Sequence, residues 1–122
     1  MITNIYRIYK RRLFTAAVFV AAAIACAAAP AMAADDAAQL ATGKKLFLQT
    51  TVPPCAICHT LKDAGAAGEV GPVLDEIKPD AARVAKAVRD GIGAMPSFKT
   101  ALSDEQIAAI AVYVAKASGG AK

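Results

Sequence analysis

The pentapeptide Cys55-Ala56-Ile57-Cys58-His59 decides how the rest of this 122-residue chain is interpreted. Two thiols three residues apart, followed at once by an imidazole, are typical of a covalent haem attachment site. Each cysteine can add to one of the two vinyl groups on the same porphyrin edge, and those bonds fix the ring. The imidazole of His59 then points at the iron, for which it is a strong ligand. The spacing therefore predicts one haem c, held by Cys55 and Cys58 and ligated by His59.

Two other kinds of site use cysteines and histidines in similar patterns. A thioredoxin-type redox pair has cysteines at this spacing but lies in a βαβ unit, and no alternating run of β-branched or aromatic residues surrounds Cys55. A structural zinc site needs four ligands, usually from two separated clusters. Beyond residue 33 the cysteines and histidines are Cys55, Cys58 and His59 alone. The surrounding sequence therefore favours haem.

Residues 1–33 have the order of a cleaved secretory signal peptide. Basic residues come first, with no acidic residue before Asp35, and an apolar run over residues 13–29 follows. Pro30 ends that run, and Ala31-Met32-Ala33 supplies the small side chains that a signal peptidase recognises. Cleavage after Ala33 would leave residues 34–122 as one domain of 89 residues (122 minus 33).

Three alternatives concern the same segment. Residues 13–34 are about long enough to span a bilayer as an uncleaved anchor, although the cleavage site and Pro30 argue against one. Cys26 could carry a lipid, but leucine is preferred where Ala23 stands. Arg11 and Arg12 resemble part of a twin-arginine export signal, yet haem c is attached outside the cytoplasm to an unfolded chain. We therefore expect ordinary export to the periplasm, without stable membrane insertion.

The net charge of +4 comes from this predicted leader alone. The leader holds four basic residues and no acidic one, so residues 34–122 carry ten of each sign. A nucleic-acid partner therefore has no support, because such proteins present a basic surface.

Residues 34–122 contain few large side chains for a core. The aromatic ones are Phe47, Phe98 and Tyr113, and the chain has no tryptophan. A domain of this size buries a modest fraction of its surface, so a covalent haem would supply apolar volume that the chain lacks. We expect the haem-free chain to be largely unfolded.

Three helices are expected from residue patterns. The first covers residues 35–49, begins at a cap formed by Asp35 or Asp36, and has Lys44 and Lys45 facing solvent. The second covers residues 81–89 after Asp80 as its N-cap. The third follows the capping box that begins at Ser103, and its apolar residues fall at helical spacing: Ile107, Ile110, Ala111 and Val114. Residues 64–69, with two glycines, are expected to form a loop.

Two proline segments are expected to position the pentapeptide. Pro53-Pro54 is stiff and extended, so it delivers Cys55 on a fixed approach. Gly71-Pro72 favours extended backbone, which suits a carbonyl group that accepts a hydrogen bond from the outer nitrogen of His59. A plain turn at Gly71-Pro72 is the alternative.

Met95 is the candidate for the second axial ligand of the iron. Residues 34–122 contain no other methionine and no second histidine. Methionines usually fill cores, but Met95 belongs to no helical stripe. It lies in a glycine-rich loop that Pro96 ends, and a His/Met pair raises the haem potential.

The chain resembles the class I (monohaem) cytochromes c over nearly all of residues 34–122. The resemblance rests on the attachment pentapeptide, Gly71-Pro72, Met95-Pro96, and the motif Gly43-Lys44-Lys45-Leu46-Phe47 with Tyr113-Val114. It implies an all-α cytochrome c fold, with three or more helices wrapped around one covalently attached haem. It also implies that Gly43 and Phe47 meet the last helix at Tyr113. The link between Phe47 and Cys55 is longer than in many members.

More narrowly, residues 53–63 and 70–74 resemble the small haem subunit of bacterial sulfite dehydrogenases. That resemblance implies a molybdopterin subunit as electron donor, with a terminal oxidase or another cytochrome as acceptor. We expect a one-electron carrier and not an enzyme. The alternatives are a shuttle for another respiratory dehydrogenase or oxidase, and a ligand-binding haem protein with a labile Met95. Met95 has no acid, base or arginine beside it in sequence, as peroxide chemistry would need.

Overall fold

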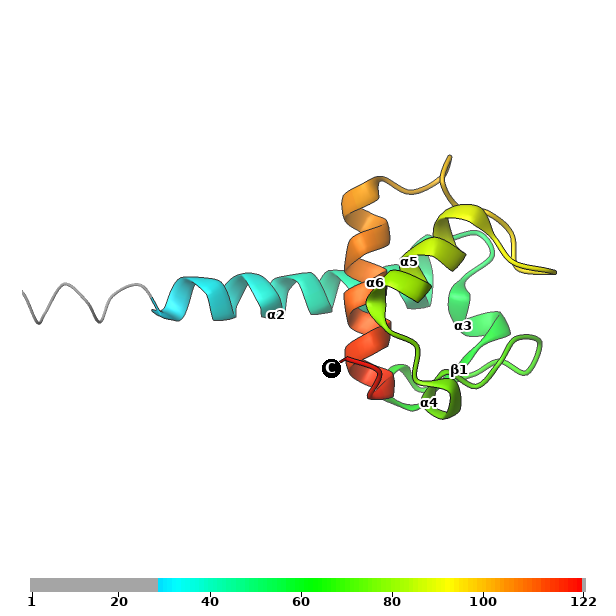
Figure 1. Ribbon diagram of the computed structural model, residues 1–122, viewed down its shortest axis with the longest axis horizontal. Helices are drawn as coiled ribbons and strands as arrows, with labels where there is room; N and C mark the ends of the chain where they lie inside the picture. Colours follow the sequence, from blue (N-terminus) through cyan, green and yellow to red (C-terminus); the bar gives the residue numbers. More distant parts are fainter. Residues whose placement is uncertain (1–28, 122) are drawn as a thin grey trace, which may run out of the picture. The chain divides into compact units, whose positions relative to one another are not determined.

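The computed structural model describes residues 29–121, and side chains from residue 34 onward. Most of the predicted signal peptide therefore lies outside the described residues. The longer helices are α2 (Ala29–Lys45), α5 (Ala81–Asp90) and α6 (Asp104–Ser118) (Figure 1). One-turn helices α3 (Cys55–Cys58) and α4 (Leu74–Ile77) and a π-helical turn η1 (Leu46–Thr50) lie between them. No helix in this described part is long and apolar enough to cross a membrane.

The second and third predicted helices are confirmed, together with their caps. The Asp80 carboxylate accepts a hydrogen bond from the backbone N–H of Arg83 (2.8 Å) at the start of α5. At the start of α6, Ser103 and Gln106 form both bonds of the capping box. Such caps satisfy backbone donors that the first turn leaves free. Local sequence is enough to specify where both helices begin.

The first helix differs from its prediction at both ends. Its described part already runs from Ala29, so neither Asp35 nor Asp36 is the N-cap, because the alanine-rich residues before them also adopt helix. At the other end α2 gives way to the π-helical turn η1, which ends at Thr50. The predicted helical stretch is thus present, but its last turn is wider than an α-helix.

Gly43 allows α2 to pack directly on α6. A Cβ atom at this residue would collide with the backbone carbonyl of Ala109 and lie 2.5 Å from the Cβ of Tyr113. Beside this crossing the rings of Phe47 and Tyr113 meet edge to face, with centroids 6.1 Å apart. Both rings are buried. The contact implied by the family resemblance is therefore present in the structure.

Replacing Gly43 with alanine is expected to destabilise the haem-loaded protein by about 2 kcal/mol, since overpacking a close contact costs roughly 1–3 kcal/mol. The higher helix propensity of alanine offsets only about 1 kcal/mol of that strain. Denaturant unfolding measures the change, with Lys45→Ala on the exposed side of α2 as control. Equal denaturant midpoints for Gly43→Ala and Lys45→Ala would contradict the close contact between α2 and α6 at Gly43.

Asp63 ties three elements together, and sequence reasoning missed it. Its carboxylate accepts hydrogen bonds from the Tyr113 hydroxyl (2.7 Å) and the Lys44 ammonium (3.1 Å). The first bond, then the second, lowers the pKa of Asp63, while burial and the same carboxylate raise that of Tyr113. Lys44 also donates to the Asp63 carbonyl. The Lys44 side chain is still 42% exposed and Lys45 is exposed, as expected of a solvated face, but nothing in the sequence indicated the ion pair between Lys44 and Asp63.

The region after the pentapeptide contains a small ribbon where a loop was expected. Strands β1 (Thr60–Leu61) and β2 (Ala66–Ala67) pair antiparallel, with Thr60 opposite Ala67, around the 3-10 turn η2 (Lys62–Ala64). Gly65 turns the chain with a positive φ of 63°. The fold is otherwise helical, and the all-α class is confirmed.

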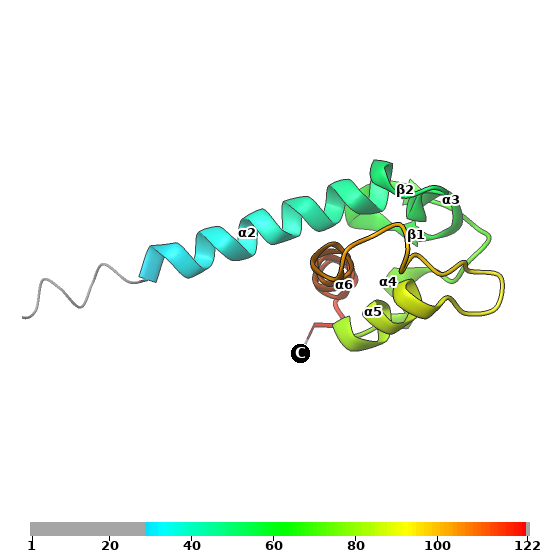
Figure 2. The ribbon, with the colours of Figure 1, turned by 90° about the horizontal axis from the view of Figure 1, so that it is seen from above.

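The core lies where α6 meets α5, α4 and η1. In Figure 2 α6 is seen nearly end-on, and α5 lies well apart from α3. The side chains that are almost fully buried come from η1, β1 and α6: Phe47, Leu61, Ile107, Ile110 and Val114.

Candidate haem-binding site

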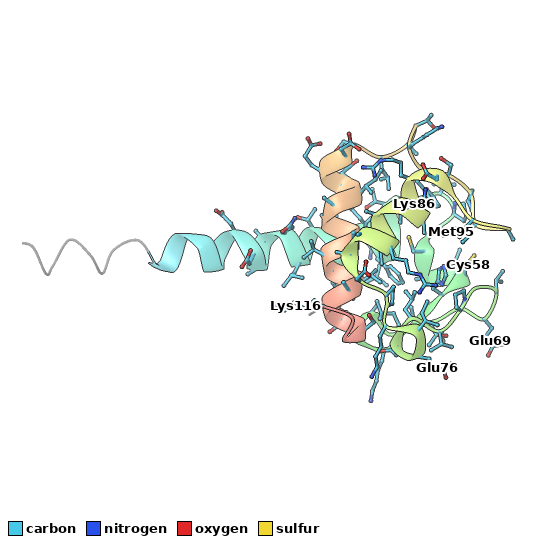
Figure 3. All side chains as sticks on the ribbon, in the orientation of Figure 1. Cys58, Glu69, Glu76, Lys86, Met95 and Lys116 are labelled. Carbon is cyan, nitrogen blue, oxygen red and sulfur yellow. The ribbon has the colours of Figure 1, made fainter. Side chains whose placement is uncertain are left out.

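A cavity of about 480 Å³ opens among α3, α5 and the loop that carries Met95. Its volume lies in the range of small-molecule and cofactor sites, roughly 300–1,000 Å³. All five residues predicted for the site line this cavity: Cys55, Cys58, His59, Pro72 and Met95. Figure 3 shows Met95 and Cys58 beside each other in projection. The fold thus brings residues from widely separated parts of the sequence to one space.

The local geometry of the pentapeptide follows from the prolines before it and the single turn it forms. Pro54 is extended (φ −62°, ψ 142°) and serves as the N-cap of α3. One helical turn then puts Cys55 and Cys58 on the same side, since residues three apart share a helix face. His59 leaves the turn in extended conformation, with its N–H bonded to the Cys55 carbonyl (3.0 Å). Both thiols and the imidazole therefore reach the same cavity.

The imidazole of His59 is held by backbone on its outer side. Its Nδ1 lies 2.9 Å from the Pro72 carbonyl oxygen. A carbonyl can only accept, so this bond requires the proton on Nδ1 and leaves Nε2 with a free lone pair. Gly71 makes room for the ring, because a Cβ there would lie 2.5 Å from Cε1 of His59. The arrangement prepares Nε2 as a ligand for a metal.

The Met95 loop is a tight turn that closes on itself. Ile92 and Met95 exchange two backbone hydrogen bonds, of 3.0 and 3.1 Å. Gly91 and Gly93 take positive φ angles of 75° and 58°, which favour glycine. A Cβ on Gly91 would also lie 2.7 Å from the Met95 carbonyl oxygen. The glycines therefore shape this loop and do not loosen it.

The same loop is fastened to the end of α5. Ser97 donates from its hydroxyl to the Arg89 carbonyl (2.6 Å), and Phe98 donates from its N–H to the Val88 carbonyl (2.9 Å). Phe98 is buried in the core. Met95 is thus placed at the cavity by a turn that is anchored on both sides.

The environment of the thiols argues against a redox dithiol. Burial raises the pKa of Cys55 and outweighs the opposing effect of the Thr51 hydroxyl, 3.7 Å from its sulfur. Reactive redox cysteines instead have a lowered pKa. Among residues 29–121, no three His, Cys, Asp or Glu side chains gather as a metal site, so this region offers no group of that kind for zinc.

The walls of the cavity suit a large apolar ring. They include core side chains that sequence reasoning assigned only to helix packing: Phe47, Leu74, Val84, Val88, Phe98, Ile110 and Val114. Periodicity along α5 and α6 marks such residues as buried, but it cannot show that they face a cofactor and not another helix. Two thiols, a prepared imidazole and a thioether around these walls fit haem c. When bound, haem supplies an iron that changes oxidation state by one electron.

Comparisons with known proteins agree with this chemistry. Residues 38–114 match the family described as cytochrome c oxidase, cbb3-type, subunit III. The structure is also similar to the crystal structure of the c-type cytochrome SorU from Sinorhizobium meliloti. That match has 56% sequence identity and a TM-score of 0.64, and it covers 69% of this chain and 95% of SorU. The chain therefore belongs to the cytochrome c family, as an electron-transfer protein with a covalently bound haem c.

Proposed function

We propose that the protein is a periplasmic one-electron carrier in which His59 and Met95 are the axial ligands of the haem iron. The observation that carries the proposal is the shared cavity, which has Cys55, Cys58 and His59 on its wall together with Met95. The bond from His59 to the Pro72 carbonyl supports the proximal ligand, because it leaves Nε2 free. Export to the periplasm is supported by the predicted leader and by the attachment of haem c outside the cytoplasm.

Both axial residues favour electron transfer over ligand binding. Thioether sulfur stabilises reduced iron, so a His/Met pair gives a higher potential than two histidines. The alternative of a labile Met95 is disfavoured, because the turn that holds Met95 is bonded to itself and to α5. Slow binding of carbon monoxide to the reduced protein is the corresponding expectation.

The surface near the cavity supports transient docking of a redox partner. Val70 and Ile92 line the cavity yet are 77% and 71% exposed, and Ile57 within the pentapeptide is 60% exposed. Weak electron-transfer encounters bury small contacts. These exposed apolar side chains would give such a contact without a permanent interface.

We propose further that the electron donor is a molybdenum sulfite dehydrogenase. Support comes from residues 53–63 and 70–74, which resemble the small haem subunit of such enzymes. A terminal oxidase or another cytochrome would accept the electrons. The alternatives are a free shuttle for another dehydrogenase or oxidase, and a haem subunit held permanently by the enzyme.

Sulfite is expected to reduce the purified ferric protein only when a periplasmic extract of its host is present. With His59 and Met95 both bound to the iron, as proposed, sulfite has no open position on the haem, so the visible spectrum of the protein alone should stay ferric until the extract supplies the donor. The measurement is the rise of the ferrous absorption after sulfite alone, extract alone, or sulfite and extract together are added to the ferric protein. Reduction by sulfite alone, or no reduction with both, would contradict the sulfite pathway. A stable co-purified molybdenum protein would favour the permanent subunit.

A further inference from the structure

Two basic side chains line the cavity, and both come from α5. Arg83 and Lys86 are one turn apart. The other titratable residues that line it are Cys55, Cys58 and His59, which are the proposed thioether and iron ligands. An anionic group bound in this cavity would therefore meet lysine or arginine side chains only from α5.

The two basic groups differ in what already binds them. Lys86 donates to the Asp90 carboxylate at 2.8 Å, one turn along α5, and its side chain is 80% exposed. Arg83 takes part in none of the ion pairs found among the described side chains. The nearest carboxylate in sequence, Asp80, accepts a hydrogen bond from the backbone N–H of Arg83 as the helix cap. Arg83 is also exposed, and among the described side chains this cavity-lining residue has no carboxylate partner.

Haem brings two carboxylates to this cavity. They lie on the propionate side chains, on the part of the porphyrin edge away from the vinyl groups that the cysteines attach. A haem attached through Cys55 and Cys58 on α3 would have its propionate edge on the side away from α3, and α5 lies well apart from α3 (Figure 2). A carboxylate beside apolar walls is costly unless a charged donor pairs with it. A guanidinium suits this role, because its planar fork binds both carboxylate oxygens at once.

We infer that Arg83 binds a haem propionate and that Lys86 does not. Asp90 holds the lysine, whereas the arginine is available at the cavity wall. The bound guanidinium is a positive charge near the haem, so it favours the reduced iron, which carries one positive charge less. Arg83 then has a second role besides orienting the haem: it contributes to the reduction potential. This inference rests on the haem-bearing function proposed above.

The test compares Arg83→Gln with Lys86→Gln, two substitutions that each remove one positive charge from the same face of α5. The midpoint potential at pH 7 is expected to fall in Arg83→Gln and to change by less than half as much in Lys86→Gln. Arg83→Lys keeps the charge and should recover most of the loss. Equal shifts in the two glutamine variants, or no shift in Arg83→Gln, would overturn the inference.

Nuclear magnetic resonance gives a second readout that a long-range charge effect would not change. Residues 34–122 contain only two arginines, Arg83 and Arg89, so the signal that disappears in Arg83→Lys identifies the Nε–H of Arg83. We expect this proton to exchange slowly with water in the reduced, haem-loaded protein. Exchange as fast as in free arginine would overturn the inference. Absence of the far-red thioether–iron band from the ferric unmodified protein would instead reject Met95 as the axial ligand. Failure of the Arg83 inference can therefore be told apart from failure of the proposed function.

Discussion

Replacing Met95 with histidine is expected to lower the midpoint reduction potential by ~0.2 V, a fraction of the roughly 0.8 V range that haem axial ligands span. Imidazole donates more strongly to ferric iron than a thioether does, so the oxidised state gains stability. The weak far-red band of the thioether–iron bond should disappear from the ferric spectrum. Voltammetry and visible spectroscopy of the purified variant measure both effects.

Ile92→Ala is the matched control for this prediction. Ile92 lies in the same turn, pairs with Met95 through backbone atoms only, and is 71% exposed. Its truncation leaves those two hydrogen bonds in place, so the far-red band should persist, and because Ile92 lines the cavity any change in potential should be much smaller than that of Met95→His. An unchanged potential in Met95→His would reject Met95 as the ligand.

The double variant Cys55→Ala/Cys58→Ala, which cannot attach haem, is expected to lack a cooperative thermal transition. Without the ring, the side chains of the 480 Å³ cavity lose their packing partner. The side chains that lose it include buried core residues such as Phe47, Ile110 and Val114, which would then face water. A small domain is stable by only about 5–15 kcal/mol, so the loss of this packing is expected to abolish cooperative folding. Circular dichroism on heating measures the loss.

The haem-loaded protein under the same conditions is the control, and it should unfold in one sharp transition. Glu69→Ala, a substitution of an exposed residue near the cavity, should leave that transition almost unchanged. A cooperative transition in the haem-free double variant would show that the helices fold without the cofactor.

The predicted caps of the second and third helices were accurate because they depend only on neighbours in sequence. The caps at Asp80 and Ser103 join atoms three residues apart, so the residue types alone indicate them. The predicted cap of the first helix was wrong because the alanine-rich residues before Asp35 also adopt helix, which leaves both aspartates inside it. The ion pair of Lys44 was not predicted because its partner, Asp63, lies 19 residues further along the chain.

The sequence by itself determined the chemistry of the protein: a pentapeptide with two thiols and an imidazole, a single methionine beyond it, and helices whose caps are local. Only the tertiary structure decided which groups meet. It joined Tyr113 to Asp63, 50 residues apart. Of the two arrangements that the sequence left open at Gly71-Pro72, it has the one in which the Pro72 carbonyl meets His59. It also turned Arg83 toward the cavity while Asp90 holds Lys86. The physical reason is that local bonds depend on spacing along the chain, whereas these contacts depend on how the helices pack.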